Sequence, residues 1–285
     1  MRLASAVRCL LPSRATSRAI ALLTWAAATQ AAAQPQLRQP TGKWVVDYGE
    51  TSCTAARRYG TAEQPVTLAF RPSPDGNVVR LMVARPGRVP SPYHFPVTTT
   101  VTSEKAKTTG LRFASTDKKL DIIWINFQRA ALEGLPQAGE IVLKSGRELD
   151  ERFVLPGIAA VLKALDRCNA DLRKHWNADE AAAAALSKVA TPVKPLHRVV
   201  SNTDYPRQAM MEGASGLTRI MMMIDETGTL KDCMVVETSG IATLDAMSCG
   251  LLLERAGKFN PALDAAGKPV KSVYTAAFRW VVPPG

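Results

Sequence analysis

The chain is poor in the residues from which metal sites and acid–base sites are built. Histidine occurs only three times in 285 residues, and His94, His175 and His197 lie far apart with no obvious carboxylate beside them. No two cysteines are spaced two to four residues apart, as zinc ligands often are. Phosphate-binding, dinucleotide-binding and zinc-protease motifs are also missing. The sequence therefore indicates no metal, no cofactor and no catalytic site, and each histidine is interpreted as a surface or packing residue.

Long runs of one charge are absent as well. The 36 basic residues outnumber the 25 acidic ones and give a net charge of +11, but they are scattered among the acids. A nucleic-acid surface usually gathers its basic residues into a patch or stripe. We therefore predict no nucleic-acid partner, and we expect the charge mainly to favour solubility.

No apolar run near the start is long enough to cross a membrane. Several arginines precede an apolar stretch at residues 19–28, and a run of alanines follows at residues 31–33. The apolar stretch is shorter than the about 20 residues that a membrane span needs. There is no twin-arginine pair, and an arginine directly before Cys9 does not fit a lipoprotein attachment site. The pattern predicts a secretory signal peptide at residues 1–33, cleaved after Ala33, and export to the periplasm.

Four cysteines remain after such a cleavage, namely Cys53, Cys168, Cys233 and Cys249. An even number in an oxidising compartment favours disulfides over free buried thiols. Three pairings are possible, and we favour Cys53 with Cys168 and Cys233 with Cys249 because each pair then lies inside one predicted domain. In the chain-entropy model the shorter loop stabilises the fold by roughly 3 kcal/mol and the longer one by somewhat over about 4 kcal/mol.

A change of composition divides the sequence after its first two thirds. Residues 177–190 are nearly all alanine with a few charges, and a Thr-Pro-Val-Lys-Pro run follows at residues 191–195. Alanine helices and proline-rich runs both act as semi-rigid spacers. We therefore expect two domains, residues 41–176 and residues 197–283, joined by a linker at residues 177–196.

The first domain is predicted to be a mainly antiparallel sheet closed by a long helix. Strand patterns occur at residues 65–70, 77–84, 93–102, 111–115, 120–127, 141–144 and 152–155. A Pro-Ser-Pro-Asp-Gly run between the first two predicts a hairpin turn. Residues 157–176 then carry apolar side chains at helical spacing. This helix should pack on the sheet and bring Cys168 toward Cys53.

The second domain has clear signals for a short helix, a hairpin, a second helix and a last strand. Asp204 is a typical N-cap for a helix at residues 205–212. Strands at residues 217–224 and 231–238 flank a turn whose glycine, Gly228, supplies a positive φ. A helix at residues 244–256 follows. In the last strand, Tyr274, Ala276, Phe278 and Trp280 alternate with residues of the opposite face.

A spaced set of short motifs runs through this second domain. In chain order they are Tyr205-Pro206, Gly213, Gly216, Asp225 with Gly228, Cys233, Ser239-Gly240, Leu244-Asp245, Cys249, Phe259-Asn260-Pro261-Ala262 and Gly267-Lys268-Pro269. The set resembles the C-terminal domain of the TonB family from residue 197 to residue 283. The resemblance implies a small fold of helix, strand, strand, helix and strand, and a binding domain rather than a catalytic one.

The resemblance also implies a binding surface. In the family, the stretch around the Tyr-Pro motif and the last strand contact a peptide of an outer-membrane transporter, which pairs with the domain as an added strand. Carried over by position, the partner-binding residues are Asn202, Tyr205, Pro206, Tyr274, Ala276, Phe278 and Trp280. An edge strand can bind an extended peptide through its unpaired N–H and C=O groups. Alternating aromatic residues on a strand usually belong to the core, which would leave the backbone as the binding element.

Taken together, the sequence predicts a secreted α+β protein of two domains that binds a periplasmic or outer-membrane protein or peptide without catalysis. In one alternative, residues 1–33 stay uncleaved as an inner-membrane anchor and the protein is an energy transducer for transport. In the other, the first domain is a hydrolase that the second domain targets. Its best match is Ser-Thr-Asp-Lys at residues 115–118 with Lys-Ser-Gly at residues 144–146, which resemble the motifs of penicillin-binding enzymes. There the serine opens a helix, whereas Ser115 is expected to end a strand.

Overall fold

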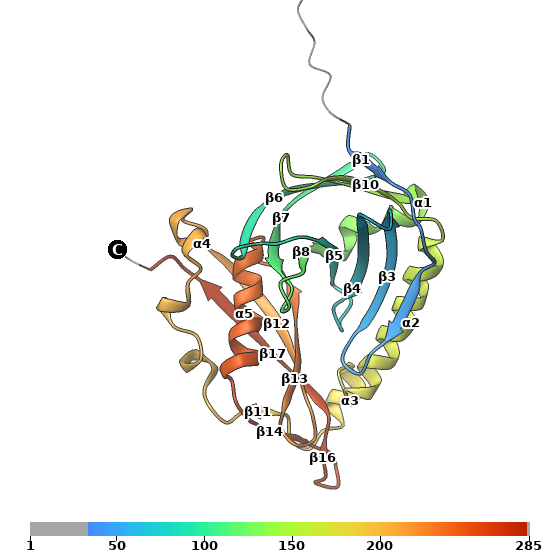
Figure 1. Ribbon diagram of the computed structural model, residues 1–285. Coiled ribbons are helices and arrows are strands. Elements are labelled where there is room, and N and C mark those ends of the chain that lie inside the picture. Colours follow the sequence, from blue (N-terminus) through green and yellow to red (C-terminus); the bar gives the residue numbers. More distant parts are fainter. Residues whose placement is uncertain (1–33, 284–285) are drawn as a thin grey trace, which may run out of the picture. The chain divides into compact units, whose positions relative to one another are not determined.

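The computed structural model of the chain describes residues 34–283 (Figure 1), so the predicted signal peptide lies outside the described residues. From Gln34 onward the chain forms one compact unit. It contains a large curled sheet, a long helix and a C-terminal part of helices and strands, which confirms the predicted α+β class. The boundary between two domains near residue 190 stays a prediction.

The large sheet has ten strands in the order β1-β10-β9-β6-β7-β8-β5-β4-β3-β2. Their bounds are β1 Gln36–Arg38, β2 Val45–Tyr48, β3 Cys53–Gly60, β4 Pro65–Pro72, β5 Val78–Pro86, β6 Tyr93–Val101, β7 Glu104–Ala114, β8 Leu120–Gln128, β9 Glu140–Lys144 and β10 Asp150–Val154. Only β1 and β10 run parallel. Every predicted strand of this part is present, whereas β1, β2 and β3 were not predicted, and β7 begins well before the predicted residue 111.

A long helix, α2 (Ile158–His175), closes the core of the curled sheet. Its buried side chains include Ile158, Val161 and Leu165, the apolar stripe predicted from the sequence. Cys168 on the same face is bonded to Cys53 of β3, with 6.0 Å between the Cα atoms. This is one of the two pairs favoured from the sequence. The connection from β8 to β9 contains two short helical turns, η1 (Arg129–Leu132) and α1 (Leu135–Ala138).

The C-terminal part is a three-stranded antiparallel sheet with α5 on one face (Figure 1). Its elements are η3 Asn202–Asp204, α4 Arg207–Met211, β12 Gly216–Ile224, β13 Leu230–Glu237, α5 Ala242–Arg255, β14 Phe259–Asn260, β15 Ala262–Leu263, β16 Pro269–Val270 and β17 Ser272–Trp280. The strand order is β13-β12-β17. Gly228 in the β12–β13 turn has a φ of 75°, and a Cβ there would lie 2.0 Å from the Phe259 carbonyl oxygen. Both the backbone conformation and the close approach therefore require glycine.

The predicted start of the first C-terminal helix is wrong. Tyr205 and Pro206 are extended, with ψ angles of 124° and 126°, and α4 begins at Arg207. A residue before proline is disfavoured in the helical region, which explains why Tyr205 does not join the helix. Asp204 closes a separate 3₁₀ turn instead, because its carboxylate accepts the Ser201 N–H at 2.9 Å. The second helix, α5, begins at Ala242 rather than at the predicted residue 244.

The alanine- and proline-rich segment is bonded to the C-terminal part. It contains a short helix, α3 (Glu180–Ala184), whose N-terminus is capped by Asp179, then the strand β11 (Thr191–Pro192) and the turn η2 (Leu196–Arg198). β11 pairs with β14, and the Ser187 N–H donates to the Leu263 carbonyl at 2.9 Å. These bonds attach the segment to the motifs around residue 260.

Candidate functional site: the free edge of strand β17

The last strand, β17, is paired along one edge only. All nine of its residues pair with β12, from Ser272 opposite Ile224 to Trp280 opposite Gly216. Within residues 34–283 no other strand pairs with β17, which therefore forms an edge of its sheet. In an antiparallel ladder alternate residues direct their N–H and C=O groups away from the partner strand. The outer edge of β17 therefore offers a row of backbone donors and acceptors.

The predicted binding side chains of β17 lie on its inner face. Tyr274, Ala276 and Phe278 are half-buried against the core of the C-terminal part, and Trp280 is buried. Residues 275, 277 and 279, between them on the opposite face, are exposed. The strand thus presents its backbone and this exposed face, while most of its aromatic surface packs inward.

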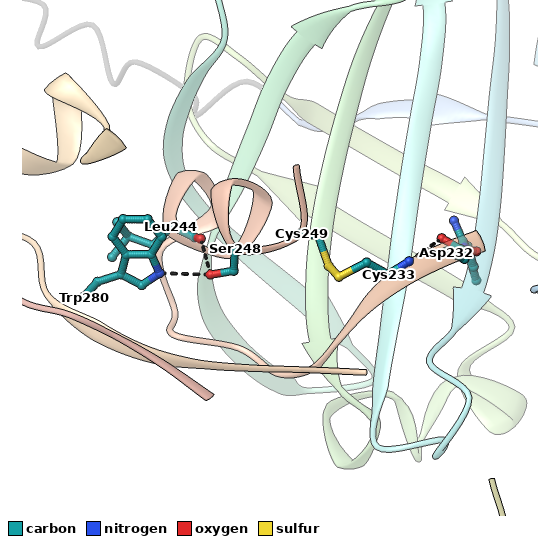
Figure 2. The surroundings of a disulfide bond; sticks show 7 residues. Asp232, Cys233, Leu244, Ser248, Cys249 and Trp280 are labelled. Carbon is teal, nitrogen blue, oxygen red and sulfur yellow. Dashed lines mark hydrogen bonds and ion pairs between the residues drawn. A yellow bond between two sulfur atoms is a disulfide. The ribbon is translucent and has the colours of Figure 1, made fainter. Parts of the chain in front are cut away.

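Two of the predicted binding residues, Tyr205 and Trp280, are in contact with each other. Their rings meet edge to face with centroids 5.6 Å apart, and both side chains are buried. The Tyr205 hydroxyl donates to the Ala214 carbonyl, and the Trp280 Nε1–H donates to the Ser248 hydroxyl at 2.9 Å (Figure 2). The pair anchors the end of β17 to α5 and to the chain before α4.

The remaining two predicted residues lie at the surface. Asn202 is exposed in the turn η3, and Pro206 is half-buried just before α4. The same turn is held by Asp204, whose pKa is lowered first by the Ser201 backbone N–H and then by the Arg255 guanidinium. Because Tyr205 lies between Asn202 and Pro206, the structure places these two residues next to the anchored end of β17.

The second disulfide and a buried carboxylate hold α5 on the sheet. Cys233 of β13 is bonded to Cys249 of α5 with 5.5 Å between the Cα atoms, the other pair favoured from the sequence (Figure 2). Asp245 is almost fully buried and accepts hydrogen bonds from Ser239, Thr218 and other groups. The sequence analysis noted the Ser-Gly and Leu-Asp motifs without a role for them. In the structure, the aspartate of the second motif fixes the turn formed by the first.

The C-terminal part is also bonded to the large sheet. The Gln208 side-chain amide accepts the His94 backbone N–H at 2.9 Å and donates to the His94 carbonyl at 2.8 Å. The His94 ring lies between the Thr243 hydroxyl at 2.9 Å and the Glu212 carboxylate at 2.7 Å. Burial opposes the charged form of Glu212, but the bonds from Gln208 and His94 outweigh it and lower the pKa of Glu212. His94 therefore has a carboxylate partner that sequence spacing did not reveal, since Glu212 is distant along the chain.

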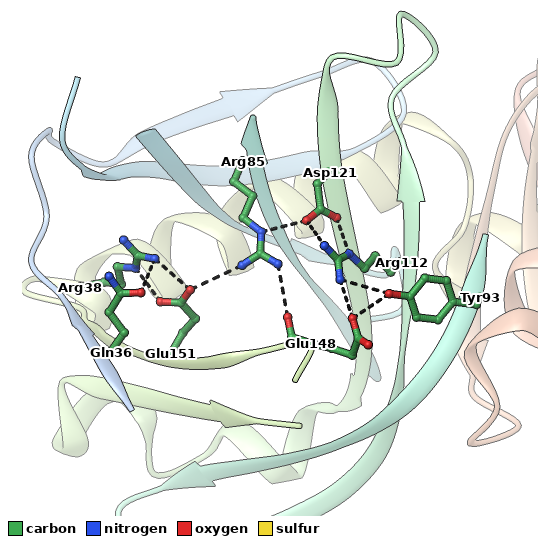
Figure 3. A network of polar contacts seen from close by, with 8 residues as sticks. All are labelled: Gln36, Arg38, Arg85, Tyr93, Arg112, Asp121, Glu148 and Glu151. Atoms are coloured by element: carbon green, nitrogen blue, oxygen red, sulfur yellow. Dashed lines mark hydrogen bonds and ion pairs between the residues drawn. The ribbon is translucent and has the colours of Figure 1, made fainter. Parts of the chain in front are cut away.

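A network of charged side chains spans one end of the curled sheet (Figure 3). Arg112 of β7 donates to Asp121 of β8 at 2.8 Å and also contacts Glu148 and the Tyr93 hydroxyl. Arg85 of β5 donates to the same aspartate at 2.8 Å. The network extends to the Arg38–Glu151 ion pair, which joins β1 to β10. Its arginines and carboxylates are matched one to one, so it joins strands rather than presenting an unbalanced charge.

The serine of the hydrolase alternative lies in a turn. The Ser115 hydroxyl donates to Asp117 at 2.5 Å and accepts the Leu120 N–H at 3.0 Å, inside the turn between β7 and β8. The Lys-Ser-Gly run begins at the end of β9, where the Ser145 N–H donates to Leu149. No hydrogen bond joins the two motifs within the described part of the chain. Nor do residues 34–283 contain a group of three metal-binding side chains.

Comparison with known proteins finds a family match for the C-terminal part. No curated protein matches the chain. Among solved structures, the crystal structure of invasion associated protein b from Bartonella henselae is similar at 19% identity and a TM-score of 0.35, with 47% of this chain and 99% of that chain covered. Residues 201–282 match the family model of the Gram-negative bacterial TonB protein C-terminal. The resemblance inferred from the spaced motifs is thus confirmed over residues 201–282, which match the TonB C-terminal family model.

Proposed function

We propose that the protein is a non-enzymatic periplasmic binding protein that captures an extended segment of an outer-membrane transporter by strand addition to β17. The single observation that carries this proposal is the pairing of β17 along one edge only, over nine residues. Main-chain hydrogen bonds would provide the affinity, and the side chains that alternate along the strand would provide specificity.

The length and composition of β17 suit this role. Nine residues of strand extend over roughly 30 Å, enough for several consecutive backbone hydrogen bonds. No proline interrupts the strand, so no backbone donor is missing. The anchored pair Tyr205 and Trp280 holds the strand in place before a partner arrives, which reduces the entropy lost on binding.

The disulfides and the predicted signal peptide support a periplasmic location, because disulfides persist in oxidising compartments. No helix within residues 34–283 is long and apolar enough to cross a membrane. The energy-transducer alternative depends on residues 1–33. Mass spectrometry of fractionated cells separates the two: a soluble form that begins at Gln34 supports the free binder, and an intact membrane-held form supports the transducer.

Site-specific cross-linking tests the binding site. A photoreactive residue in place of Ala277, which is exposed on β17, should form an adduct with an outer-membrane transporter in cells. The same residue in place of Ala266, exposed in the turn between β15 and β16, is the matched control and should form none. Adducts at both positions or at neither would contradict the proposed site.

Backbone pairing is tested with peptides. A peptide from the cross-linked segment is N-methylated at every second residue in one version and at the intervening residues in another. Strand addition directs alternate N–H groups toward the partner, so one version should lose binding and the other should keep it. Equal loss in both versions would contradict strand addition.

A further inference from the structure

A pocket of about 430 Å³ lies where the large sheet meets the helices of the C-terminal part. Its apolar walls come from both parts of the chain: Leu111, Phe113 and Trp124 from β7 and β8, and Pro206, Ala246 and Met247 from the region of α4 and α5. Its volume is within the range of small-molecule sites, which often lie between domains. The C-terminal family fold alone supplies only half of this pocket.

The aromatic wall is fixed before any ligand binds. Phe113 and Trp124 meet edge to face with ring centroids 4.6 Å apart. The buried Arg80 guanidinium lies 4.3 Å from the Trp124 ring centroid, and Arg80 is itself held by a 3.1 Å hydrogen bond to Asn126. The indole is therefore constrained by a cation–π contact and by the edge of a second ring.

The polar groups of the opposite wall are already engaged. Gln208 and Thr243 both line the pocket, but the Gln208 amide is bonded to the His94 backbone and the Thr243 hydroxyl to the His94 ring. Arg207 is the one charged residue that lines the pocket, and no acidic side chain does. Arg207 is exposed and forms no ion pair with any residue of 34–283. The pocket thus combines an apolar interior with an uncompensated positive charge.

We propose that this pocket binds a small amphipathic anion, an aryl or short alkyl carboxylate or sulfonate. The apolar body lies between the aromatic wall and Met247, and the acidic group is bound by Arg207. Apolar burial supplies the affinity, and a guanidinium can pair with a carboxylate or sulfonate through two parallel N–H···O bonds. Charge complementarity selects an anion over a neutral ligand of the same shape. The pocket includes no residue of β17, although it shares Pro206 with the predicted partner-binding residues.

Two probes of the same shape test the proposal on the full mature chain by isothermal titration. Anilinonaphthalene sulfonate carries an aromatic body and an anionic group, and phenyl-naphthylamine has the same body without the sulfonate. We expect the anionic probe to bind about tenfold more tightly, a difference of about 1.4 kcal/mol. Arg207→Gln should remove that preference and leave the affinity for the neutral probe unchanged. Arg198→Gln removes an exposed arginine that does not line the pocket and should behave as the unchanged protein.

A third variant locates the site. Ala246 is half-buried in the pocket wall, so Ala246→Trp should fill the pocket and abolish binding of both probes. Equal affinity of the two probes for the unchanged protein would overturn the proposed preference for an anion. If Arg207→Gln still prefers the anionic probe over the neutral one, or if a folded Ala246→Trp variant binds both probes as before, the anion binds elsewhere. Either result would also overturn the proposal. Because Arg207 is exposed, the first variant keeps the test decisive even if the tryptophan disturbs folding.

Discussion

At the scale of single residues, Asp245 shows how one carboxylate can hold a turn and a helix together. It is 1% exposed and accepts hydrogen bonds from the Ser239 N–H and hydroxyl and from the hydroxyls of Thr218 and Thr238. Asp245→Ala would leave these buried and half-buried donors without an acceptor, so we expect the free energy of unfolding to fall by about 3 to 5 kcal/mol in urea titrations. Asp166→Ala, at an exposed ion pair with Arg129, should change it by less than about 1 kcal/mol. Equal losses would contradict the role of Asp245.

A second carboxylate should make stability depend on acid pH. Burial disfavours the charged form of Asp121, but bonds from Arg112 and Arg85 outweigh it, so its pKa lies below the ordinary value of 3.8. A carboxyl with a lowered folded pKa stabilises the fold above its unfolded pKa, and this stabilisation is lost as the pH falls through the folded pKa. We expect stability to decrease below about pH 4, and Asp121→Asn to reduce that decrease. Urea titrations at several pH values from neutral to acid measure how the free energy of unfolding of each protein falls with pH. An equal fall in the unchanged protein and in Asp121→Asn would contradict the assignment.

At the scale of elements, the disulfide between β13 and α5 joins the helix covalently to the sheet on which it packs. Cys233 and Cys249 are 16 residues apart, a loop for which the chain-entropy model gives roughly 3 kcal/mol. Replacing both cysteines by serine should lower the free energy of unfolding by about 2 to 4 kcal/mol. Thermal unfolding under oxidising conditions measures the loss. Under reducing conditions the unchanged protein should approach the double variant, and a persistent gap would show that the serines act through something other than the lost bond.

Sequence patterns predicted some helices and strands accurately and missed others. The sequence predicted β8, β17 and α2 close to their observed bounds. Burial of one face imposes a period of two residues on a strand and an apolar stripe on a helix, and both patterns can be read from the sequence. β3 was missed because Arg57 and Arg58 interrupt the alternation of small and apolar residues along the strand. The start of α4 was misplaced because Asp204 has the chemistry of an N-cap but serves the preceding turn.

The candidate site was predictable only in part, for a related physical reason. Motif order indicated β17 and the Tyr-Pro stretch, since these residues form one local unit of the family fold. The polar contacts of His94, Gln208 and Glu212 join residues far apart in the chain, and so does the pocket beside them. No periodic pattern encodes contacts of this kind, because they depend on how helices and strands from distant parts of the chain pack against each other.

At the scale of the whole molecule, the two parts of the chain share a core. Met223 of β12 is buried among residues of the large sheet and α2. Met223→Ala should therefore lower stability by about 2 to 5 kcal/mol, although the residue belongs to the C-terminal part. Met211→Ala, at a methionine that is 72% exposed, should change stability by less than about 0.5 kcal/mol.

The shared core also predicts a single unfolding transition. Hydrogen exchange should show the amides of β12 and of β4 losing protection together as urea is raised, in the unchanged protein and in Met223→Ala. Separate transitions for the large sheet and the C-terminal part would contradict a common core.

The bond between Gln208 and His94 has a consequence for self-association. Along the first half of β6 the side away from β7 is open, because β9 pairs with β6 only at residues 98–100. Gln208 occupies both backbone groups of His94 on that side, and two residues later Pro96 has no N–H to offer. A second chain would find no continuous row of donors there. Strand exchange between copies of the protein is therefore blocked at β6, whereas β17 stays open to a partner.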